Sequence, residues 1–490
     1  MRTSNLAKQA SIYSTAKIFE FIIKFITPIM LVRIFTKEDY GLYQQLNTLS
    51  LTFPIFISLG IHTSFYFFYP NLSKNNRKSL FSQSFYTLFF IGIIFIILFN
   101  IFDNYIFSLF GKNSQSLIHF KFPISLFVFF FVLGELTEHL LIVEKKNKFI
   151  FSYIILLSIL RTLLVLLTAY FTKKVFYTFW AIVIFQFSRS LFIYIYLKIK
   201  YQISILKIKF ELYKKQMRYS LPVGGATLVE TITRKASSLI LISFLNPINY
   251  AIYSIGTFRI PFINIFYLSI TQVSIPKLSE FYFNGEIKKA INLWHKIIIK
   301  LHTFIFPIII FSYVIAKPLF IFLFTEQYIG SIIIFRIIIF SFLLNSIITV
   351  PILRAFNKTN LFFKINLISS PFMIAITYIL INLFSYVGGA ISILVNTVTL
   401  QIIFIIKVKK IFNLSINDLL PYHKLINISL KAIIPIFPIF FICKLPLNNN
   451  FIILCISTIL YFIPLSIIYF KTNILSIDII KSVFKFSRKQ

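Results

Sequence analysis

Charged side chains occur inside segments of this sequence that are otherwise apolar enough to cross a membrane. Eight of them are basic, namely Lys17, Lys24, Arg161, Arg189, Arg234, Lys235, Arg259 and Arg336. Four are acidic, namely Glu20, Glu135, Glu138 and Glu230. Each charge at the centre of a bilayer costs roughly 2.5–3.5 kcal/mol. A surplus of four positive charges is therefore expected where helices enclose a hydrated cavity that receives an anion.

The first apolar segment carries a charged stripe. Lys17, Glu20, Lys24 and Thr27 are spaced by three, four and three residues, which places them on one face of a helix. We expect Glu20 to pair with one lysine and to leave the other free. The pattern favours a face that lines a cavity. The alternative is a helix near the membrane surface whose lysines extend outwards to water.

A second charged stripe lies in the seventh apolar segment. Glu230 and Arg234 are one helical turn apart, and Thr227 and Ser238 extend the same face. The two stripes predict two half-sites that face one cavity, in which Glu20 and Glu230 are also candidates for coupling to proton or sodium movement. A purely structural ion pair is the alternative for Glu230 and Arg234.

Arginine is concentrated in the apolar segments. Five of the 11 arginines lie there, against three of the 38 lysines. A guanidinium group stays charged when dehydrated and binds phosphate through two parallel hydrogen bonds, so this bias favours a phosphate or diphosphate ligand over a cation. The predicted substrate-binding residues are Lys17, Lys24, Arg161, Arg189, Arg234 and Arg259.

The fourth apolar segment carries Glu135, Glu138 and His139. Glu135 and His139 are one turn apart, which fits either a proton relay or a hydrogen-bonded helix contact. His62, in the second segment, is interpreted as a hydrogen-bond donor between helices. We expect no metal site, because a metal needs more ligands than these, and the sequence has no motif of a catalytic nucleophile.

The composition is that of a polytopic membrane protein. Of the 490 residues, 58% are hydrophobic and 13% charged, and the mean hydropathy is +0.86. We predict an all-α fold with about fourteen membrane spans, each near the ~20 residues that a bilayer requires. Their approximate ranges are 10–34, 42–70, 80–101, 119–142, 149–171, 175–197, 219–245, 249–276, 297–316, 331–353, 362–384, 387–406, 426–443 and 451–470.

The basic residues outside the spans are distributed asymmetrically. Of the 49 Lys and Arg residues, 33 fall on the side of the amino terminus and 8 on the opposite side, and the other 8 lie within spans. This asymmetry predicts that both termini are cytoplasmic. It also explains the net charge of +35 by contact with anionic lipid rather than nucleic acid.

A weak internal repeat divides the chain. Tyr40 and Tyr43 follow the first span as Tyr250 and Tyr253 follow the seventh, with an offset of 210 residues. Such a parallel repeat of six spans is typical of transporters. The predicted parts are an amino-terminal lobe (1–197), a cytoplasmic linker (198–218), a carboxy-terminal lobe (219–408), and two extra spans with a basic tail (409–490).

The stretch Arg33-Ile34-Phe35-Thr36-Lys37-Glu38-Asp39-Tyr40-Gly41, followed by Leu59-Gly60-Ile61, resembles the start of Wzx-type polysaccharide flippases of the multidrug/oligosaccharidyl-lipid/polysaccharide exporter superfamily. The resemblance implies two pseudo-symmetric six-helix lobes arranged in a V around a cationic cavity. It also implies a non-enzymatic transporter in a bacterial cytoplasmic membrane. The substrate would be an undecaprenyl-diphosphate-linked oligosaccharide, such as an O-antigen repeat unit, which moves to the outer leaflet by alternating access.

Other interpretations of the sequence remain open. A flippase for peptidoglycan or teichoic-acid precursors has the same charge requirement, whereas a cation-coupled drug antiporter would need a net acidic cavity. A membrane-embedded polysaccharide polymerase would be expected to carry a long outer loop with catalytic groups, which this chain lacks. The implied partners are the lipid-linked oligosaccharide, membrane lipids and a polysaccharide polymerase or chain-length complex. No cofactor is expected.

Overall fold

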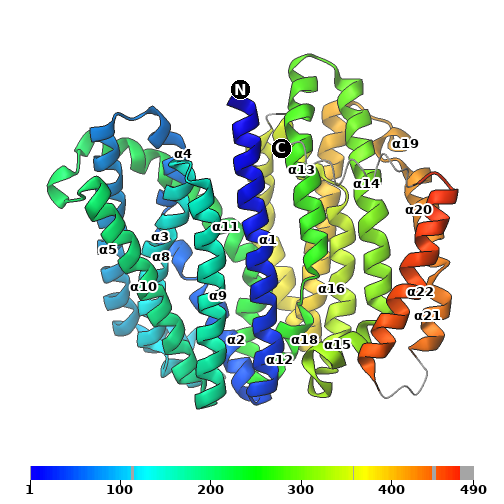
Figure 1. Cartoon of the computed structure of the whole chain (residues 1–490), viewed down its shortest axis with the longest axis horizontal. Coiled ribbons are helices and arrows are strands. Elements are labelled where there is room, and N and C mark those ends of the chain that lie inside the picture. Colours follow the sequence, from blue (N-terminus) through cyan, green and yellow to red (C-terminus); the bar gives the residue numbers. More distant parts are fainter. Residues whose placement is uncertain (1, 112–114, 357, 444–448, 475–490) are drawn as a thin grey trace. The chain divides into compact units, whose positions relative to one another are not determined.

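The computed structural model describes residues 2–111, 115–356, 358–443 and 449–474. In these residues every regular element is helical, so the predicted all-α class is confirmed. The chain forms two compact units, Met1–Ala251 and Ile252–Gln490 (Figure 1). The boundary between the units, after Ala251, lies beyond the predicted linker 198–218. The division into two six-span lobes remains a prediction.

The first unit contains eleven α-helices in its described residues. They are α1 (Arg2–Ile34), α2 (Lys37–Ser50), α3 (Pro54–Ser58), α4 (Ile61–Phe68), α5 (Lys74–Ile101), α6 (Asp103–Ser108), α7 (Gln115–Ile118), α8 (Lys121–Val143), α9 (Asn147–Thr172), α10 (Val175–Tyr201) and α11 (Phe210–Phe244). Helix α12 (Pro247–Gly256) crosses the boundary between the units. Helix α1 lies alongside α9, and α8 packs against α5 and α10 (Figure 1).

The second unit contains the remaining described helices. They are α13 (Pro261–Phe283), α14 (Ile287–Val314), α15 (Ala316–Phe324), α16 (Ser331–Asn345), α17 (Thr349–Ala355), α18 (Thr359–Phe412), α19 (Ile416–Leu419), α20 (Tyr422–Ile433), α21 (Ile436–Ile442) and α22 (Asn450–Lys471). Helices α14, α20, α21 and α22 share one hydrophobic cluster. Within it, Tyr461 donates a hydrogen bond to the carbonyl of Ala432 over 3.1 Å.

The turns that carry the repeat are capped by Thr36 and Asn246, whose residue types favour the start of a helix. The hydroxyl of Thr36 accepts a hydrogen bond from the amide of Asp39 over 3.1 Å at the start of α2. The side chain of Asn246 accepts one from the amide of Asn249 over 2.9 Å at the start of α12. Each side chain satisfies an amide that the first turn of a helix leaves without a partner.

The two repeat-related turns also contact each other. A Cβ added to Gly41 would lie 1.8 Å from the carbonyl oxygen of Pro247, so only glycine permits this approach. The hydroxyl of Tyr250 donates to Thr48 Oγ1 over 2.9 Å at the same place. The turn after α11 is therefore packed within the first unit.

The second predicted span is broken rather than continuous. It consists of α2, α3 and α4, and its two halves meet at an angle of 51°. Leu59 and Gly60 have φ values of 45° and 70°, which ends α3 and starts α4 in a new direction. A Cβ on Gly60 would lie 2.5 Å from the carbonyl oxygen of Ser220, so α11 crosses the chain closely at this break.

Helix α18 is two helices joined at a kink. Ser385 has a φ of 52° and a ψ of −134°, which no helix accommodates. The position matches the boundary predicted between the ranges 362–384 and 387–406. Gly388 follows in close contact with the carbonyl of Leu380, where a Cβ would lie at 1.9 Å.

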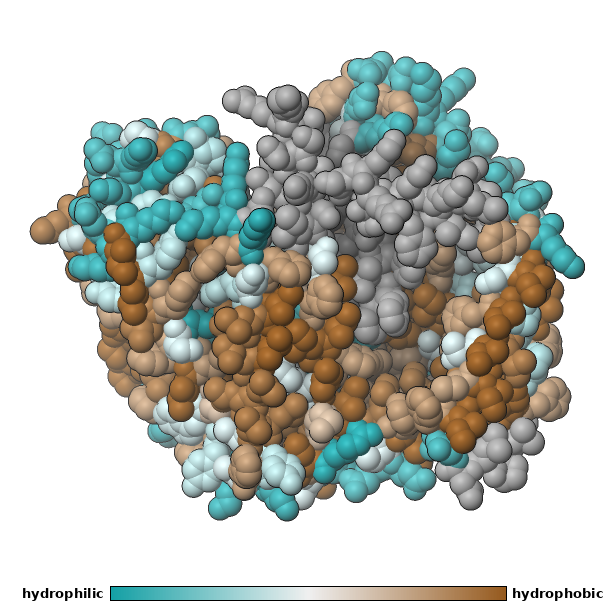
Figure 2. Space-filling model, in the orientation of Figure 1, coloured by the Kyte–Doolittle hydropathy of each residue, from teal (hydrophilic) through white to brown (hydrophobic). Residues whose placement is uncertain are grey.

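The helices have the length and polarity of membrane spans. Among the described residues, nine helices are long and apolar enough to cross a membrane, or ten if the bent α2–α4 pair is one span. Figure 2 shows hydrophobic side chains over the middle of the helices and hydrophilic ones towards their ends. The protein is thus a multi-pass membrane protein.

Candidate functional site

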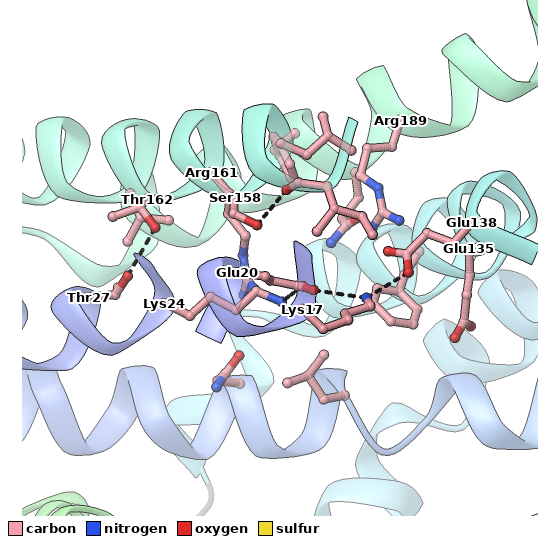
Figure 3. A pocket seen from close by; sticks show the side chains of 18 of the residues that line it. Lys17, Glu20, Lys24, Thr27, Glu135, Glu138, Ser158, Arg161, Thr162 and Arg189 are labelled. Carbon is pink, nitrogen blue, oxygen red and sulfur yellow. Dashed lines mark hydrogen bonds and ion pairs between the residues drawn. The ribbon is translucent and has the colours of Figure 1, made fainter. Parts of the chain in front are cut away.

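A cavity of about 680 Å³ lies inside the first unit, among α1, α2, α8, α9 and α10 (Figure 3). Its volume is in the range of sites that hold drug-sized ligands. Its charged lining residues are Lys17, Glu20, Lys24, Glu135, Glu138, Arg161 and Arg189. Its uncharged polar lining includes Gln44, Asn47, Ser158, Thr162 and Gln186.

The charged stripe of α1 forms one wall of this cavity, as its spacing predicts. Glu20 binds Lys17 over 2.9 Å through Oε2 and binds Lys24 through Oε1. The expectation that one lysine is free is therefore wrong. The physical reason is that Glu20 lies between the two lysines on the helix, so each of its carboxylate oxygens reaches one ammonium group.

Lys17 has a second carboxylate partner that the sequence did not reveal. Its Nζ donates to Glu138 Oε2 over 2.7 Å, and Glu138 belongs to α8. This ion pair joins α1 to α8 across the cavity edge (Figure 3). Glu138 thus lines the cavity, whereas the sequence left its segment as either a proton relay or a hydrogen-bonded helix contact.

Arg161, from α9, faces the same cavity and is the least engaged cation in it. It has no hydrogen bond or ion pair with any other residue that the structure describes. Its neighbour Thr162 lies 3.4 Å from Thr27 of α1, measured between the hydroxyl oxygens. The guanidinium donors of Arg161 therefore remain available to a ligand.

Arg189, from α10, has only uncharged partners. Its Nη1 donates to the side-chain oxygen of Gln186 over 3.1 Å, and its Nη2 lies 3.5 Å from the carbonyl oxygen of Gly134. Its Nε is buried without a hydrogen-bond partner among the described residues. A buried charged donor in this condition is costly unless an anion binds it.

The cavity separates its charges into two groups. Four basic and three acidic side chains line it, which gives a formal charge of +1. The carboxylates of Glu20 and Glu138 bind the two lysines, whereas Arg161 of α9 and Arg189 of α10 pair with no carboxylate among the described residues. We call Arg161 and Arg189 the arginine wall of the cavity. An oxyanion can bind there without breaking an ion pair.

A histidine pair lies at one end of the cavity. The rings of His62 and His139 are 5.4 Å apart between centroids, and His139 lines the cavity. His62 donates through Nε2 to the carbonyl oxygen of Val132 over 2.9 Å, so its interpretation as a donor between helices is confirmed. The contact of the two rings could not be predicted from the sequence, because it depends on how α4 packs against α8. The described residues include no group of three or more potential metal ligands.

The remaining predicted residues lie elsewhere. Glu230 and Arg234 pair on α11 over 3.8 Å, with side chains 50% and 68% exposed, and they do not line this cavity. Lys235 beside them donates to the carbonyl of Leu51 over 2.9 Å at the break after α2. Arg259 belongs to the second unit and lies in the non-helical stretch between α12 and α13, not within a helix.

Solved structures of membrane transporters share the fold of this chain. The lipid II flippase MurJ in an inward closed conformation matches with a TM-score of 0.75 at 16% identity, covering 94% of this chain and 99% of MurJ. A multidrug resistance MATE transporter of the MOP superfamily matches with a TM-score of 0.58 at 15% identity, covering 82% and 94%. These identities establish the fold alone. A MOP-superfamily transporter from Pyrococcus furiosus, described by a reversed polarity of its binding pocket, gives 0.52 at 13% identity, covering 83% and 96%.

Sequence comparison gives the family. No curated protein sequence matches the chain. A family model described as polysaccharide biosynthesis protein matches residues 30–333, which is more than half of the chain. The match begins at the end of α1 and includes the segment that suggested a polysaccharide flippase. The chain therefore belongs to the polysaccharide biosynthesis protein family and has the MOP-superfamily fold.

Proposed function

We propose that this protein is a flippase for a polyprenyl-diphosphate-linked oligosaccharide, the repeat unit of an O-antigen or another surface polysaccharide. It would carry the headgroup from the inner to the outer leaflet of the bacterial cytoplasmic membrane by alternating access. The observation that carries the proposal is the arginine wall of the cavity. In the part of the chain that the structure describes, Arg161 and Arg189 have no carboxylate partner, although the cavity contains three acidic residues.

The chemistry of the cavity fits such a headgroup. A planar guanidinium binds two oxygens of one phosphate group, so two of them suit a diphosphate. The hydroxyl and amide groups of Thr162, Ser158, Asn47 and Gln44 supply hydrogen-bond partners for sugar. A space of about 680 Å³ accommodates a diphosphate with a few sugars, while the polyprenyl chain stays in lipid.

Lys17 and Lys24, on α1, have a different role in this proposal. Glu20 and Glu138 together neutralise Lys17 and Lys24 while the cavity is empty, and these lysines turn to the diphosphate when it enters. Glu20 and Glu138 are then free to accept protons, which would couple transport to proton movement. Glu230, Arg234 and Arg259 are proposed to meet the substrate in another conformation of the transport cycle.

The proposed topology has fourteen spans. It adds four to the ten given by length and polarity: α1, α11, the pair α12–α13, and the second half of α18 beyond Ser385. Charged residues lower the mean hydropathy of α1 and α11, which is what a cavity-lining span requires. The termini are proposed to be cytoplasmic and the two six-span lobes to form a V.

The polarity of the cavity favours this function over export of cationic drugs. A cation would meet four basic groups and would leave the arginines uncompensated. A flippase for peptidoglycan or teichoic-acid precursors has the same diphosphate chemistry. We favour surface polysaccharide over these precursors because of the family match.

The test is the replacement of single arginines in a strain that depends on this protein for its surface polysaccharide. Loss of a charged hydrogen-bond donor costs about 1.5–3 kcal/mol, so Arg161→Ala and Arg189→Ala should lower transport roughly tenfold or more. Surface polysaccharide would fall and lipid-linked precursor would accumulate, at equal amounts of protein in the membrane.

Arg336→Ala is the matched control. Arg336 also lies in an apolar helix, but this helix belongs to the second unit. Its guanidinium carbon lies 5.0 Å from the ring centroid of Tyr313, and its Nε donates to the carbonyl oxygen of the same tyrosine. This variant should keep normal polysaccharide. Unchanged polysaccharide in both the Arg161 and Arg189 variants would exclude the mechanism.

A further inference from the structure

Glu135 is the third acidic residue that lines the cavity of the first unit. It belongs to α8, where Phe131, Glu135, Glu138 and His139 are spaced by four, three and one residues, and all four line the cavity. These spacings place the four side chains on one face of the helix. Glu135 is half-buried on this face. Helix α8 therefore presents a single surface, partly acidic and partly aromatic, to whatever enters the cavity.

The two glutamates of this face differ in their partners. Glu138 accepts a hydrogen bond from Lys17 Nζ over 2.7 Å. Glu135 has no hydrogen bond or ion pair with any other residue that the structure describes. Figure 3 shows its carboxylate pointing away from Arg189, with no interaction drawn to it. Glu135 thus brings to the cavity an acceptor that a ligand can use.

A carboxylate in this state selects ligands by their chemistry. While ionised it accepts hydrogen bonds and donates none, so a hydroxyl or ammonium group satisfies it. A second carboxylate placed beside it is repelled, and the repulsion is stronger in a partly enclosed cavity than in water. Lys17 does not relieve this repulsion, because Glu20 and Glu138 already bind it.

Aromatic rings accompany this carboxylate in the cavity lining. Tyr13 of α1 and Phe131 of α8 both line the cavity. Lys17 Nζ lies 5.5 Å from the ring centroid of Tyr13, so this ring belongs to the α1 side of the same space. The apolar face of a sugar packs against such rings while its hydroxyl groups donate to a carboxylate. The combination is suited to a sugar.

The formal charge of the cavity agrees with this assignment. The empty cavity carries +1, and a diphosphate that joins two organic groups brings two negative charges. An uncharged sugar leaves the occupied cavity at −1, an amino sugar makes it neutral, and an acidic sugar adds a further negative charge. Each uncompensated charge in a partly enclosed site is unfavourable, so the acidic sugar is the poorest fit.

We propose that Glu135 is a specificity-determining residue. It binds the sugar part of the substrate through hydroxyl or ammonium donors, and it excludes repeat units whose sugar next to the diphosphate is acidic. This inference rests on the proposed function, because the diphosphate must occupy the arginine wall. Arg161 and Arg189 then hold the diphosphate, and the face of α8 that carries Glu135 holds the sugar.

The experiment compares two substrates of the purified full-length protein in liposomes. They are undecaprenyl-diphosphate-glucose and undecaprenyl-diphosphate-glucuronic acid, which differ in one carboxylate. Periodate added outside the vesicles oxidises only the sugar that has reached the outer leaflet, so the rate of oxidation measures transport. The parent protein should move the glucose lipid at least about tenfold faster, because like charges placed together disfavour the acidic lipid.

Glu135→Gln removes the selecting charge. Its rate with the glucose lipid should fall about threefold, because an amide oxygen accepts a hydrogen bond more weakly than a carboxylate does. Its rate with the glucuronic acid lipid should rise, because the repulsion is gone and the amide can donate to the acidic sugar. The ratio of the two rates should therefore fall to about threefold or less.

Two controls separate the charge of Glu135 from other effects. Glu135→Asp keeps the carboxylate and should keep the preference for glucose. Glu286→Gln removes a carboxylate from the start of α14 in the second unit, where Glu286 binds Lys289 over 2.7 Å, and should keep the preference as well. A ratio that falls equally in Glu286→Gln would overturn the assignment. So would an equal fall in Glu135→Asp, because side-chain shape rather than charge would then decide.

The outcomes distinguish this inference from the proposed function. A parent protein that moves neither lipid would refute the proposed function, and the inference would fall with it. A parent that moves both lipids at the same rate would leave the flippase intact and refute the role of Glu135 alone. A folded Glu135→Gln protein that moves neither lipid would place this carboxylate in the transport step itself and would overturn the inference. If Glu135→Gln does not fold, Glu135→Ala takes its place, with the same fall in the ratio expected.

Discussion

The charged stripes of α1 and α11 have similar sequences but different surroundings. Each places a glutamate one turn from a basic residue, at positions related by the repeat. On α1 the stripe is enclosed by α8, α9 and α10, so Glu20 is 14% exposed and holds two lysines. On α11 the pair of Glu230 and Arg234 is open, with the glutamate 50% exposed.

The difference arises because α1 and α11 pack against different neighbouring helices. Helix α1 runs alongside α9, which adds Arg161 to the same space. Helix α11 instead approaches α3 and α4 through Gly224, and the side chains of Glu230 and Arg234 remain exposed. A charged stripe therefore becomes a site only where a neighbouring helix supplies the facing wall.

The largest effect is expected from a substitution that blocks the close contact of α11 with the break between α3 and α4. A Cβ on Gly224 would lie 2.5 Å from the backbone carbon of Leu59, whereas one on the adjacent Gly225 would meet nothing within 4 Å. We expect Gly224→Ala to lower the free energy of unfolding by about 1–3 kcal/mol, as overpacking does. Thermal unfolding in detergent, followed by fluorescence-detected size exclusion, measures the effect.

Gly225→Ala is the control on the same helix. It should be neutral or stabilise the protein by up to about 1 kcal/mol, because alanine favours the helix over glycine. If the two variants unfold at the same temperature, α11 does not depend on this close approach. Packing at Gly224 would then not explain why the charged stripe of α11 is exposed.

The next test compares the two glutamates directly. Glu20→Gln leaves Lys24 without its carboxylate and raises the formal charge of the cavity from +1 to +2. An uncompensated ammonium group should hold the diphosphate more tightly and release it more slowly. We expect turnover to fall roughly tenfold while binding strengthens, which a liposome assay of labelled precursor can separate.

Glu230→Gln should lower turnover less than Glu20→Gln does, because its ion pair with Arg234 is exposed and such a pair contributes only about 0–1 kcal/mol. An equal loss of turnover in the two variants would contradict the distinction between the enclosed stripe of α1 and the open stripe of α11.

The sequence predicted those parts of the fold that local chemistry determines. Thr36 and Asn246 are residue types that favour the start of a helix, and they cap the helices that follow α1 and α11. The break at Ser385 was also placed correctly between two apolar ranges. Each of these features depends on residues adjacent in the chain.

The parts that were missed depend on contacts between distant residues. The break of the second span at Leu59 and Gly60 is stabilised by α11, which lies more than 150 residues away in sequence. The pairing of Glu138 with Lys17 likewise needs α1 and α8 to be neighbours. In the site, spacing predicted the α1 stripe, while the choice of Arg161 and Arg189 over Arg234 follows from packing alone.

The smallest expected effect concerns a carboxylate that is structural rather than part of a site. Glu144 lies just beyond the membrane-spanning part of α8, with its side chain 2% exposed. It binds Lys200 over 2.6 Å and accepts a hydrogen bond from Tyr196 over 2.6 Å. Burial alone would raise the pKa of Glu144, but these donors outweigh it and hold the pKa below its usual value.

A lowered pKa in the folded state stabilises the protein above the pKa of the unfolded chain, which is about 4.3 for glutamate. Glu144→Gln should therefore lower the free energy of unfolding by about 1 kcal/mol at pH 7. The difference from the parent should shrink as the pH falls below about 4.3 and the carboxylate takes up a proton in both states. Melting temperatures of the two proteins between pH 7 and pH 3 measure this. A difference between the two melting temperatures that stays constant down to pH 3 would contradict the stabilising role of the Glu144 carboxylate.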